Sequence, residues 1–183
     1  IAAAALAAGH EAILISGPVE VEYPAAARVI AVVSTEEMLA AAQAEFPRCD
    51  GLIGVAAPCD YRPVQIAPHK IAKTGAPLEL HLIETPDIVA TLGAAKRADQ
   101  WCVGFALETE DRRFRALVKL EKKSCDLIVS NGPEAMNALE NSVEILDRTG
   151  AIVAAASGSK EEVARRIFAV IQTRLIANSA RAV

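Results

Sequence analysis

The residues best suited to chemistry lie in one block of the sequence, Gly54 to Lys73. This block starts as an apolar strand, breaks at Pro58, presents Asp60 and continues into a proline-rich loop that carries Lys70. Ligands of open α/β sheets bind outside the carboxyl ends of the strands, which is where this loop begins. A carboxylate and lysines on one loop suit an anionic substrate whose charge must be neutralised during reaction. The alternative is an ordinary surface loop, because scattered charged side chains usually face water.

Polar residues follow four of the predicted strands. Because the carboxyl ends of parallel strands meet at one edge of a sheet, these residues predict a polar rim on which an anion site would lie. They are Asp60 after residues 51–57, Glu84 to Asp87 after residues 78–83, Glu108 and Thr109 after residues 101–107, and Asn131 at the end of residues 126–131.

Three further features could bind a nucleotide. A helix that begins at Pro86-Asp87-Ile88-Val89, with Thr85 as its cap, offers free N–H groups and a positive dipole end to phosphate, although a self-capped helix without a ligand fits equally well. Lys119 and Lys123 lie one turn apart on another helix, where like charges repel unless an anion lies between them; solvated lysines are the commoner explanation. Phe105 could stack on a base, but core filling is the more frequent role.

Strand and helix patterns alternate along the chain, which predicts a Rossmann-like doubly wound, mostly parallel sheet with helices on both faces. Ser34 opens one helix with Glu37 three positions later, as in a capping box. The chain would close with a C-terminal β-hairpin and a helix, so that residues 1–175 form a single domain and residues 176–183 a frayed tail. The predicted strands cover residues 11–16, 28–33, 51–57, 78–83, 101–107 and 126–131, with the hairpin at residues 142–147 and 151–155.

The composition is that of a globular protein without a general affinity for polyanions. Of the 183 residues 52% are hydrophobic, and the formal net charge is −4. We therefore expect no nucleic-acid partner and no membrane association, and any anion site must be local. The four cysteines show no metal-binding spacing, which favours reduced thiols and a cytoplasmic protein. No segment approaches the ~18 apolar residues of a membrane span, and no signal peptide is recognisable.

Residues 1–8 have the pattern of the last turns of a helix, which Gly9 would end. In α/β domains a strand and a glycine-rich turn usually come before such a helix. We therefore expect a section of that kind upstream of Ile1.

Five segments, in this order, resemble the phosphopantothenate–cysteine ligases, also called phosphopantothenoylcysteine synthetases. In many bacteria this enzyme is the C-terminal half of a bifunctional coenzyme A biosynthesis flavoprotein. The resemblance extends from Ile1 to about Leu175. The segments are LISGPV at residues 14–19, AAPCDYRP…IAPHKIAK at residues 56–73, TPDIVA at residues 85–90, VGFALET at residues 103–109 and KLEKKSCDLIVSN at residues 119–131.

The resemblance implies a ligase that joins cysteine to 4′-phosphopantothenate. CTP with Mg²⁺ would first form an acyl-cytidylate and release pyrophosphate, and the amine of cysteine would then displace CMP. The resemblance also implies a homodimer. It gives no reason to expect FMN on this chain, because nothing here is similar to the flavin-binding decarboxylase half. The sequence leaves open whether CTP is preferred strictly over ATP.

Matched position by position, the resemblance implies one catalytic residue, Lys70, which would close over the activated phosphate and the acyl-cytidylate. The nucleotide-binding residues would be Gly54, Val55 and Ala56 for cytosine through backbone groups, Asp60 for the nucleotide or its Mg²⁺, Pro86, Asp87, Ile88 and Val89 for the triphosphate, Phe105 near the nucleotide, and Lys119 and Lys123 for phosphates.

The chain departs from the family pattern at a few positions. Thr85 stands where asparagine is common, Pro58-Cys59 replaces the usual small residues, and Ala72 interrupts a lysine-rich loop. The family's glycine-rich section, with an asparagine that contacts the acyl intermediate, would lie upstream of Ile1. Two other functions remain open. An NAD(P)-dependent reductase would need a GxGxxG turn and an acidic residue at the end of the second strand, and the second requirement fails because Val33 and Ser34 stand there. A non-catalytic nucleotide-binding module is the other alternative, because the glycine-rich section is expected upstream of Ile1 and Pro58-Cys59 alters the approach to Asp60.

Overall fold

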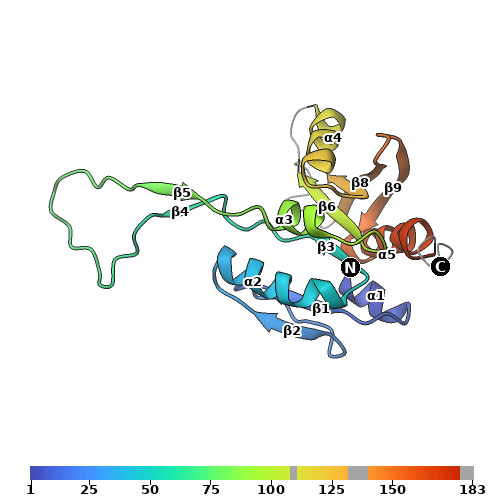
Figure 1. Ribbon diagram of the computed structural model, residues 1–183, viewed down its shortest axis with the longest axis horizontal. Coiled ribbons are helices and arrows are strands. Elements are labelled where there is room, and N and C mark those ends of the chain that lie inside the picture. The colour runs from blue at the N-terminus through green and yellow to red at the C-terminus, as the bar shows by residue number, and fades with distance from the viewer. Residues whose placement is uncertain (108–110, 132–139, 178–183) are drawn as a thin grey trace.

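The central sheet has five strands in the order β3-β6-β7-β8-β9 in the computed structural model, which describes residues 1–107, 111–131 and 140–177 (Figure 1). Strands β3, β6 and β7 run parallel, whereas β7 pairs with β8, and β8 with β9, in antiparallel fashion. The expectation of a mostly parallel sheet is therefore wrong, because the sheet is mixed. The strands are β3 (Gly51–Gly54), β6 (Trp101–Leu107), β7 (Leu127–Asn131), β8 (Glu140–Asp147) and β9 (Ile152–Ser159).

The antiparallel part is the expected C-terminal hairpin. Gly150 N–H donates to the carbonyl of Asp147 at 2.9 Å, and Asp147 Oδ1 accepts from Thr149 N–H at 2.9 Å. This tight turn returns the chain along β8, and β8 itself runs back along β7. A β-strand pattern carries no information on direction, so the sequence predicted the hairpin but not how much of the sheet is antiparallel.

Two small sheets accompany the central one. Strands β1 (Ile13–Ser16) and β2 (Arg28–Ala31) pair in parallel, and strands β4 (Tyr61–Pro63) and β5 (Leu82–Glu84) pair antiparallel. The strand predicted at residues 78–83 was expected to belong to the main sheet. Instead only Leu82–Glu84 is a strand, and it lies on an arm outside the sheet. Its alternating leucines find no core there, since Leu78 and Leu80 are each 63% exposed.

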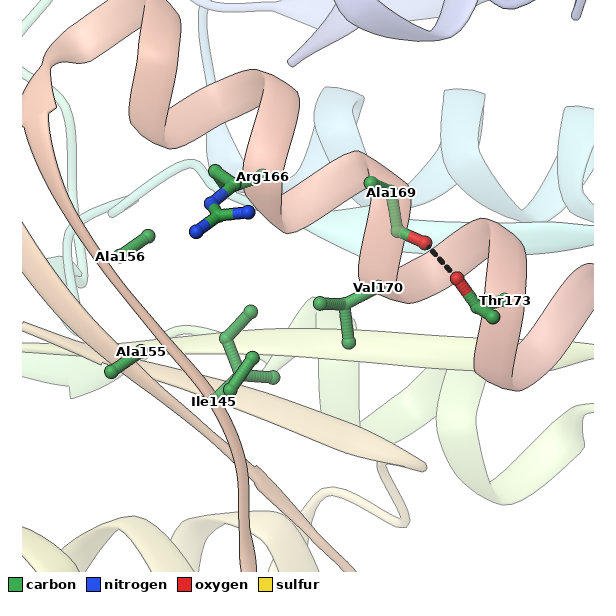
Figure 2. Close-up of a pocket in the computed structure, with 8 residues that line it drawn as sticks. Ile145, Ala155, Ala156, Arg166, Ala169, Val170 and Thr173 are labelled. Carbon is green, nitrogen blue, oxygen red and sulfur yellow. Dashed lines mark hydrogen bonds between the residues drawn. The ribbon is translucent and has the colours of Figure 1, made fainter.

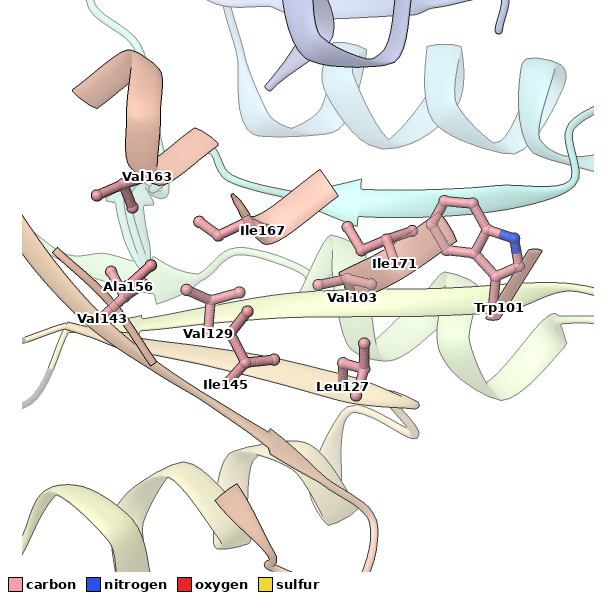
Figure 3. Packing of buried hydrophobic residues seen from close by; sticks show 10 residues of the cluster. All are labelled: Trp101, Val103, Leu127, Val129, Val143, Ile145, Ala156, Val163, Ile167 and Ile171. Carbon is pink, nitrogen blue, oxygen red and sulfur yellow. The ribbon is translucent and has the colours of Figure 1, made fainter. Parts of the chain in front are cut away.

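Helices cover both faces of the central sheet, as expected. Helix α5 (Lys160–Ile171), extended by a π-type turn at Gln172–Ile176, packs on one face against alternate residues of β6, β7 and β8 (Figure 3). Helix α4 (Arg112–Lys122) packs on the other face, through Ala116 and Leu120. Full burial of each Leu, Ile or Val side chain stabilises the fold by roughly 1.5–3 kcal/mol. The remaining helices are α1 (Ala2–Ala7), α2 (Thr35–Glu45) with a 3₁₀ turn at Phe46–Arg48, and α3 (Ile88–Ala95).

The predicted capping box at the start of α2 is confirmed. Glu37 N–H donates to Ser34 Oγ at 3.1 Å, and the Glu37 carboxylate accepts from Ser34 N–H at 3.3 Å. Helix α5 begins with the same device, formed by Ser159 and Glu162. Such caps satisfy N–H groups that have no partner within the helix.

A long extended arm, residues 61–84, leaves the body of the domain between β3 and α3 (Figure 1). Its root is fixed: Thr85 N–H donates to Asp60 O at 2.9 Å, and Arg62 pairs with Glu36 of α2. The β4–β5 ladder continues one step further, where Val64 N–H donates to His81 O at 2.9 Å. Every residue from 63 to 84 is exposed. Within the described residues, no helix has the length and apolar character needed to cross a bilayer.

Candidate functional site

The carboxyl end of β3 lies directly against the first turn of α3. A Cβ built on Gly54 would lie only 2.4 Å from Val89 Cγ2, closer than any real side chain approaches. Glycine is therefore required for this contact, and it brings the backbone that follows β3 to the amino end of α3. The predicted base-reading segment, Gly54 to Ala56, and the predicted phosphate-binding helix start are thus neighbours.

Asp87 caps α3, which begins at Ile88. The Asp87 carboxylate accepts the Ala90 N–H at 3.0 Å. The expectation that Thr85 caps this helix and that Pro86 is its first residue is wrong. Thr85 Oγ1 instead donates to the Cys59 carbonyl at 2.5 Å, which holds Thr85 at the root of the arm. The Asp87 carboxylate thus uses the N–H of Ala90, which is not one of the predicted phosphate-binding positions. The N–H groups of Ile88 and Val89, in the first turn, have no acceptor within the helix.

Lys123 reaches the same place from the C-terminal end of α4. Its Nζ lies 3.2 Å from Asp87 Oδ2, and the two side chains are 25% and 37% exposed. A second close approach holds the lysine backbone: a Cβ on Gly93 of α3 would lie 2.1 Å from the Lys123 carbonyl oxygen. Helix α3 therefore packs tightly against the end of α4. Contacts with α3 hold Lys123 in two places: Gly93 contacts its backbone carbonyl, and Asp87 pairs with its ammonium group.

Lys96 supports this arrangement, although no sequence pattern indicates its role. Lys96 Nζ donates to the Ser124 carbonyl at 2.8 Å and to Asp126 Oδ2 at 2.5 Å. Asp126 also accepts the Cys102 N–H at 2.7 Å and pairs with Arg148 at 2.7 Å. Because Ser124 follows Lys123 and has a left-handed backbone with φ of 51°, these bonds stabilise the turn from which Lys123 extends. Partners 30 positions apart leave no local pattern to detect.

Two buried thiols lie behind Lys123. Cys102 Sγ and Cys125 Sγ are 3.7 Å apart, and both residues are at most 1% exposed. The hydrogen bond from Cys102 lowers the pKa of Cys125, with a smaller contribution from the charge of Lys123, while the same bond and burial raise the pKa of Cys102. Their inaccessibility assigns them to the core beneath α4.

Asp60 lies beside this group at the root of the arm. Its carbonyl accepts the Thr85 N–H, two positions before Asp87, and its side chain is exposed. The structure therefore brings five predicted positions to one corner of the domain: Gly54, Asp60, Asp87, Val89 and Lys123. The corner combines free backbone groups, two carboxylates and an ammonium group, a set suited to a nucleotide with its phosphates.

Three other predicted residues differ in their distance from this corner: Phe105 and Lys70 lie away from it, and Lys119 lies next to it. Phe105 is half-buried and packs against the core beneath α5, on the sheet face opposite α4. Lys119 lies one turn before Lys123, and its carbonyl accepts the Lys123 N–H at 2.9 Å. Lys70 belongs to the segment beyond the β4–β5 ladder, at the exposed far end of the arm (Figure 1). Glu108 and Thr109 lie outside the described residues.

A shallow cavity of about 260 Å³ lies elsewhere, between α5 and β9 (Figure 2). Ala154, Ala155 and Ala156 leave this space open because their side chains are short. Arg166 lines one side of the cavity. On the other side the Thr173 hydroxyl donates a hydrogen bond to the Ala169 carbonyl. The cavity contains none of the predicted site residues.

Comparisons with known proteins identify the family of the chain and agree with its fold. Residues 1–175 match the family described as DNA/pantothenate metabolism flavoprotein C-terminal domain. The chain is 36% identical over 145 residues to the Coenzyme A biosynthesis bifunctional protein CoaBC of Haemophilus influenzae. That match covers 78% of this chain and 36% of the relative, so the chain spans about a third of the relative's length.

Solved structures of related proteins have the same fold. The crystal structure of the C-terminal domain of a coenzyme A biosynthesis bifunctional protein CoaBC superposes with a TM-score of 0.77 at 31% identity, covering 94% of this chain and 80% of that chain. A variant of Cab2 in complex with phosphopantothenate-cysteine superposes with a TM-score of 0.63 over 85% of this chain and 54% of that one. At 16% identity the second similarity concerns the fold alone.

Proposed function

Because the chain belongs to the family of DNA/pantothenate metabolism flavoprotein C-terminal domains, we propose that it is a phosphopantothenate–cysteine ligase domain of coenzyme A biosynthesis. In the proposed reaction a carboxylate oxygen of 4′-phosphopantothenate attacks the α-phosphorus of CTP, and pyrophosphate leaves. The amine of cysteine then attacks the acyl carbon of the resulting acyl-cytidylate, and CMP leaves. The Cab2 variant, of the same fold, is described in complex with phosphopantothenate-cysteine, which supports the choice of substrates.

The observation that carries the proposal is the corner formed by Gly54, Asp87 and Lys123. In the free protein Asp87 neutralises the Lys123 ammonium at 3.2 Å, so that no isolated cation is left in a half-buried position. A triphosphate would replace this carboxylate as the partner of Lys123 and would find the N–H groups of Ile88 and Val89 beside it. Backbone groups of Gly54, Val55 and Ala56 would contact the cytosine edge, and Lys119 and Pro86 would line the phosphates.

Mg²⁺ fits this corner as a companion of the nucleotide. Protein sites for nucleotide-bound Mg²⁺ usually supply one or two carboxylates, while phosphate oxygens supply other ligands. Asp60 is exposed at the root of the arm and is the carboxylate we assign to the ion. Within the described residues no three metal-binding side chains cluster together, so a site made of protein ligands alone is not part of the proposal. When bound, Mg²⁺ would neutralise phosphate charge.

Two further proposals concern Lys70 and the oligomer. Lys70 would place its ammonium group near the α-phosphate and the substrate carboxylate, where charge develops during the first step. The exposed apolar side chains of the arm favour a homodimer, because monomeric proteins rarely expose a large continuous apolar surface. Phe105 packs in the core beneath α5, so we expect it to support the nucleotide site indirectly, through β6.

Release of pyrophosphate tests the function. The protein is incubated with Mg²⁺, 4′-phosphopantothenate and cysteine, and CTP, ATP and NADH are compared in parallel with calorimetric titrations. We expect binding of CTP and pyrophosphate release that requires 4′-phosphopantothenate. Binding of CTP without pyrophosphate release would favour a nucleotide-binding module, and binding of NADH alone would favour a reductase.

A further inference from the structure

Cys102 and Cys125 are placed so that a disulfide can join them. Their sulfur atoms lie 3.7 Å apart. Cys125 directly precedes Asp126, whose N–H donates to the Cys102 carbonyl at 2.7 Å, so the two cysteines lie on neighbouring segments of backbone, ~4.8 Å apart in a sheet. Disulfides join residues whose α-carbons are about 4.4–6.8 Å apart, with an S–S bond of about 2.05 Å. Bond formation therefore requires the two sulfurs to approach each other by about 1.7 Å.

The two sulfurs differ in chemical character. The hydrogen bond from Cys102 lowers the pKa of Cys125, and the nearby charge of Lys123 acts in the same direction. The same hydrogen bond, together with burial, raises the pKa of Cys102, which therefore stays a thiol. Cysteines that respond to oxidants typically combine a sulfur of low pKa with a second cysteine beside it that resolves the oxidised form.

Cys125 is coupled to the turn from which Lys123 extends. Its Sγ lies 3.8 Å from the Lys123 carbonyl oxygen, the same oxygen that a Cβ on Gly93 would approach to 2.1 Å. On the β6 side, a Cβ on Gly104 would lie 3.0 Å from the Cys125 sulfur. Ser124, between Lys123 and Cys125, has a left-handed backbone that is uncommon for a residue with a side chain. Because these contacts are close, a shift of the Cys125 sulfur also moves the Lys123 backbone.

We propose that Cys102 and Cys125 are a reversible redox pair, and that their disulfide moves the turn at Lys123 and weakens its pairing with Asp87. The oxidant is a hydroperoxide. The Cys125 thiolate attacks one peroxide oxygen, the O–O bond breaks, and Cys125 becomes a sulfenic acid while hydroxide or alkoxide leaves. The Cys102 sulfur then attacks the sulfenic sulfur, the S–O bond breaks, and the hydroxyl group leaves with the Cys102 proton as water. Two electrons pass from the sulfurs to the peroxide, and a dithiol reverses the reaction by thiol–disulfide exchange.

The oxidant reaches the sulfurs by local opening of this turn. Cys102 and Cys125 are 0% and 1% exposed, so the closed structure protects them. The half-buried residues Lys123 and Ser124 directly precede Cys125, and their opening uncovers its sulfur. A nucleotide that binds Lys123 holds the turn closed and slows oxidation, and by reciprocal coupling the disulfide weakens binding of the nucleotide. This last effect rests on the proposed function, whereas the disulfide and the movement of the turn do not.

Mass spectrometry tests the disulfide without any nucleotide. A Cys59→Ser background removes the exposed thiol, and circular dichroism confirms that the protein stays folded during oxidation. Hydrogen peroxide should then remove two hydrogen atoms from the monomer and give a peptide that joins positions 102 and 125, and dithiothreitol should restore the thiols. In Cys102→Ala the reaction should stop at the sulfenic acid of Cys125, which dimedone traps. Absence of a disulfide in the folded protein, or a bridge to Cys49 instead, would overturn the proposal.

Hydrogen exchange tests the movement of the turn. Oxidation should speed amide exchange in residues 119–125 of the Cys59→Ser protein but not when Cys102→Ala is added. Unchanged exchange in a protein that carries the disulfide would contradict a displaced Lys123.

CTP with Mg²⁺ tests the link to the nucleotide site. We expect the oxidised protein to bind CTP about 10-fold more weakly than the reduced protein, as for loss of a charged hydrogen bond, and CTP to slow formation of the disulfide. Equal affinity for CTP in the two forms would overturn this link. If neither form bound CTP while exchange still responded to oxidation, the proposed function would be wrong and the redox pair would stand.

Discussion

Lys123 Nζ lies 3.2 Å from Asp87 Oδ2, so the end of α4 and the start of α3 are joined by an ion pair at the carboxyl end of β3. This pair holds the lysine in position before any ligand arrives. It also means that an incoming anion must compete with Asp87, which favours ligands with several negative charges over ligands with one. Pre-organisation of this kind is the general way in which proteins reduce the ordering cost of binding.

Removal of the lysine should weaken nucleotide binding selectively. We expect Lys123→Ala to raise the Kd for CTP about 10-fold to 100-fold, since a hydrogen bond to a charged group contributes about 1.5–3 kcal/mol. Lys122→Ala is the matched control, because Lys122 is an exposed neighbour on the same helix. Titration calorimetry at fixed ionic strength measures both. Equal losses in the two variants would mean that only overall charge matters.

The contact between Gly93 and the Lys123 carbonyl predicts a second effect. A Cβ at residue 93 would lie 2.1 Å from that oxygen, so Gly93→Ala should push α3 away from α4. We expect a loss of about 1–3 kcal/mol in the free energy of unfolding, as for other overpacked cores, together with weaker CTP binding. Gly17→Ala provides the control, since a Cβ at residue 17 would meet no atom within 4 Å. Urea denaturation that gave the same stability for both variants would contradict this account.

Local sequence signals predicted the elements that depend on neighbouring residues. The capping box of Ser34 and Glu37 is complete within four residues. The continuous apolar run of β6 is typical of a strand that is covered on both faces, and β6 is buried along most of its length. The cap of α3 was missed because Thr85 and Asp87 are both good caps. Only the contact of Thr85 with Cys59, 26 positions away, decides between them.

The candidate site was predicted in part for a similar reason. Asp60 and the Gly54 to Ala56 backbone follow a strand directly, so their place on the rim could be inferred from sequence order. The pairing of Lys123 with Asp87 depends on how α3 packs against α4, which no local pattern contains. The arm was missed because the alternation at residues 78–83 is the same for a strand at a sheet edge and for one on an isolated hairpin.

Acid should weaken the attachment of α2 to β2. Arg28 donates two hydrogen bonds to the Glu45 carboxylate, at 2.8 and 2.9 Å, and these lower the pKa of Glu45. A lowered folded-state pKa contributes stability that is present above the unfolded value of about 4.3 and is lost as the pH falls through the folded value. Thermal unfolding of Glu45→Gln between pH 3 and pH 6 should therefore depend less on pH than that of the unaltered protein.

Glu121→Gln is the control for this pH series, because Glu121 is exposed and makes no ion pair within the described residues. Its melting temperature should follow the unaltered protein at every pH. A Glu45→Gln profile that runs parallel to the unaltered one would show that the Arg28 pair contributes nothing to acid sensitivity.

Lys70 should act on the rate rather than on affinity. Its side chain is exposed on the arm in the free protein, so its ammonium group is solvated and contributes little to ground-state binding of CTP. Once it lies beside the reacting phosphate it stabilises charge that develops in the transition state, and loss of such a group typically lowers the rate by about 10²–10³. We expect Lys70→Ala to reduce the burst of pyrophosphate release in rapid-quench experiments by that factor, with the Kd for CTP unchanged. Lys73→Ala, three positions along the same exposed segment, is the control. It should change the rate of the pyrophosphate burst by less than about 10-fold, which corresponds to a change of about 1.4 kcal/mol in the activation free energy. An unchanged burst in Lys70→Ala would show that Lys70 takes no part in the chemistry.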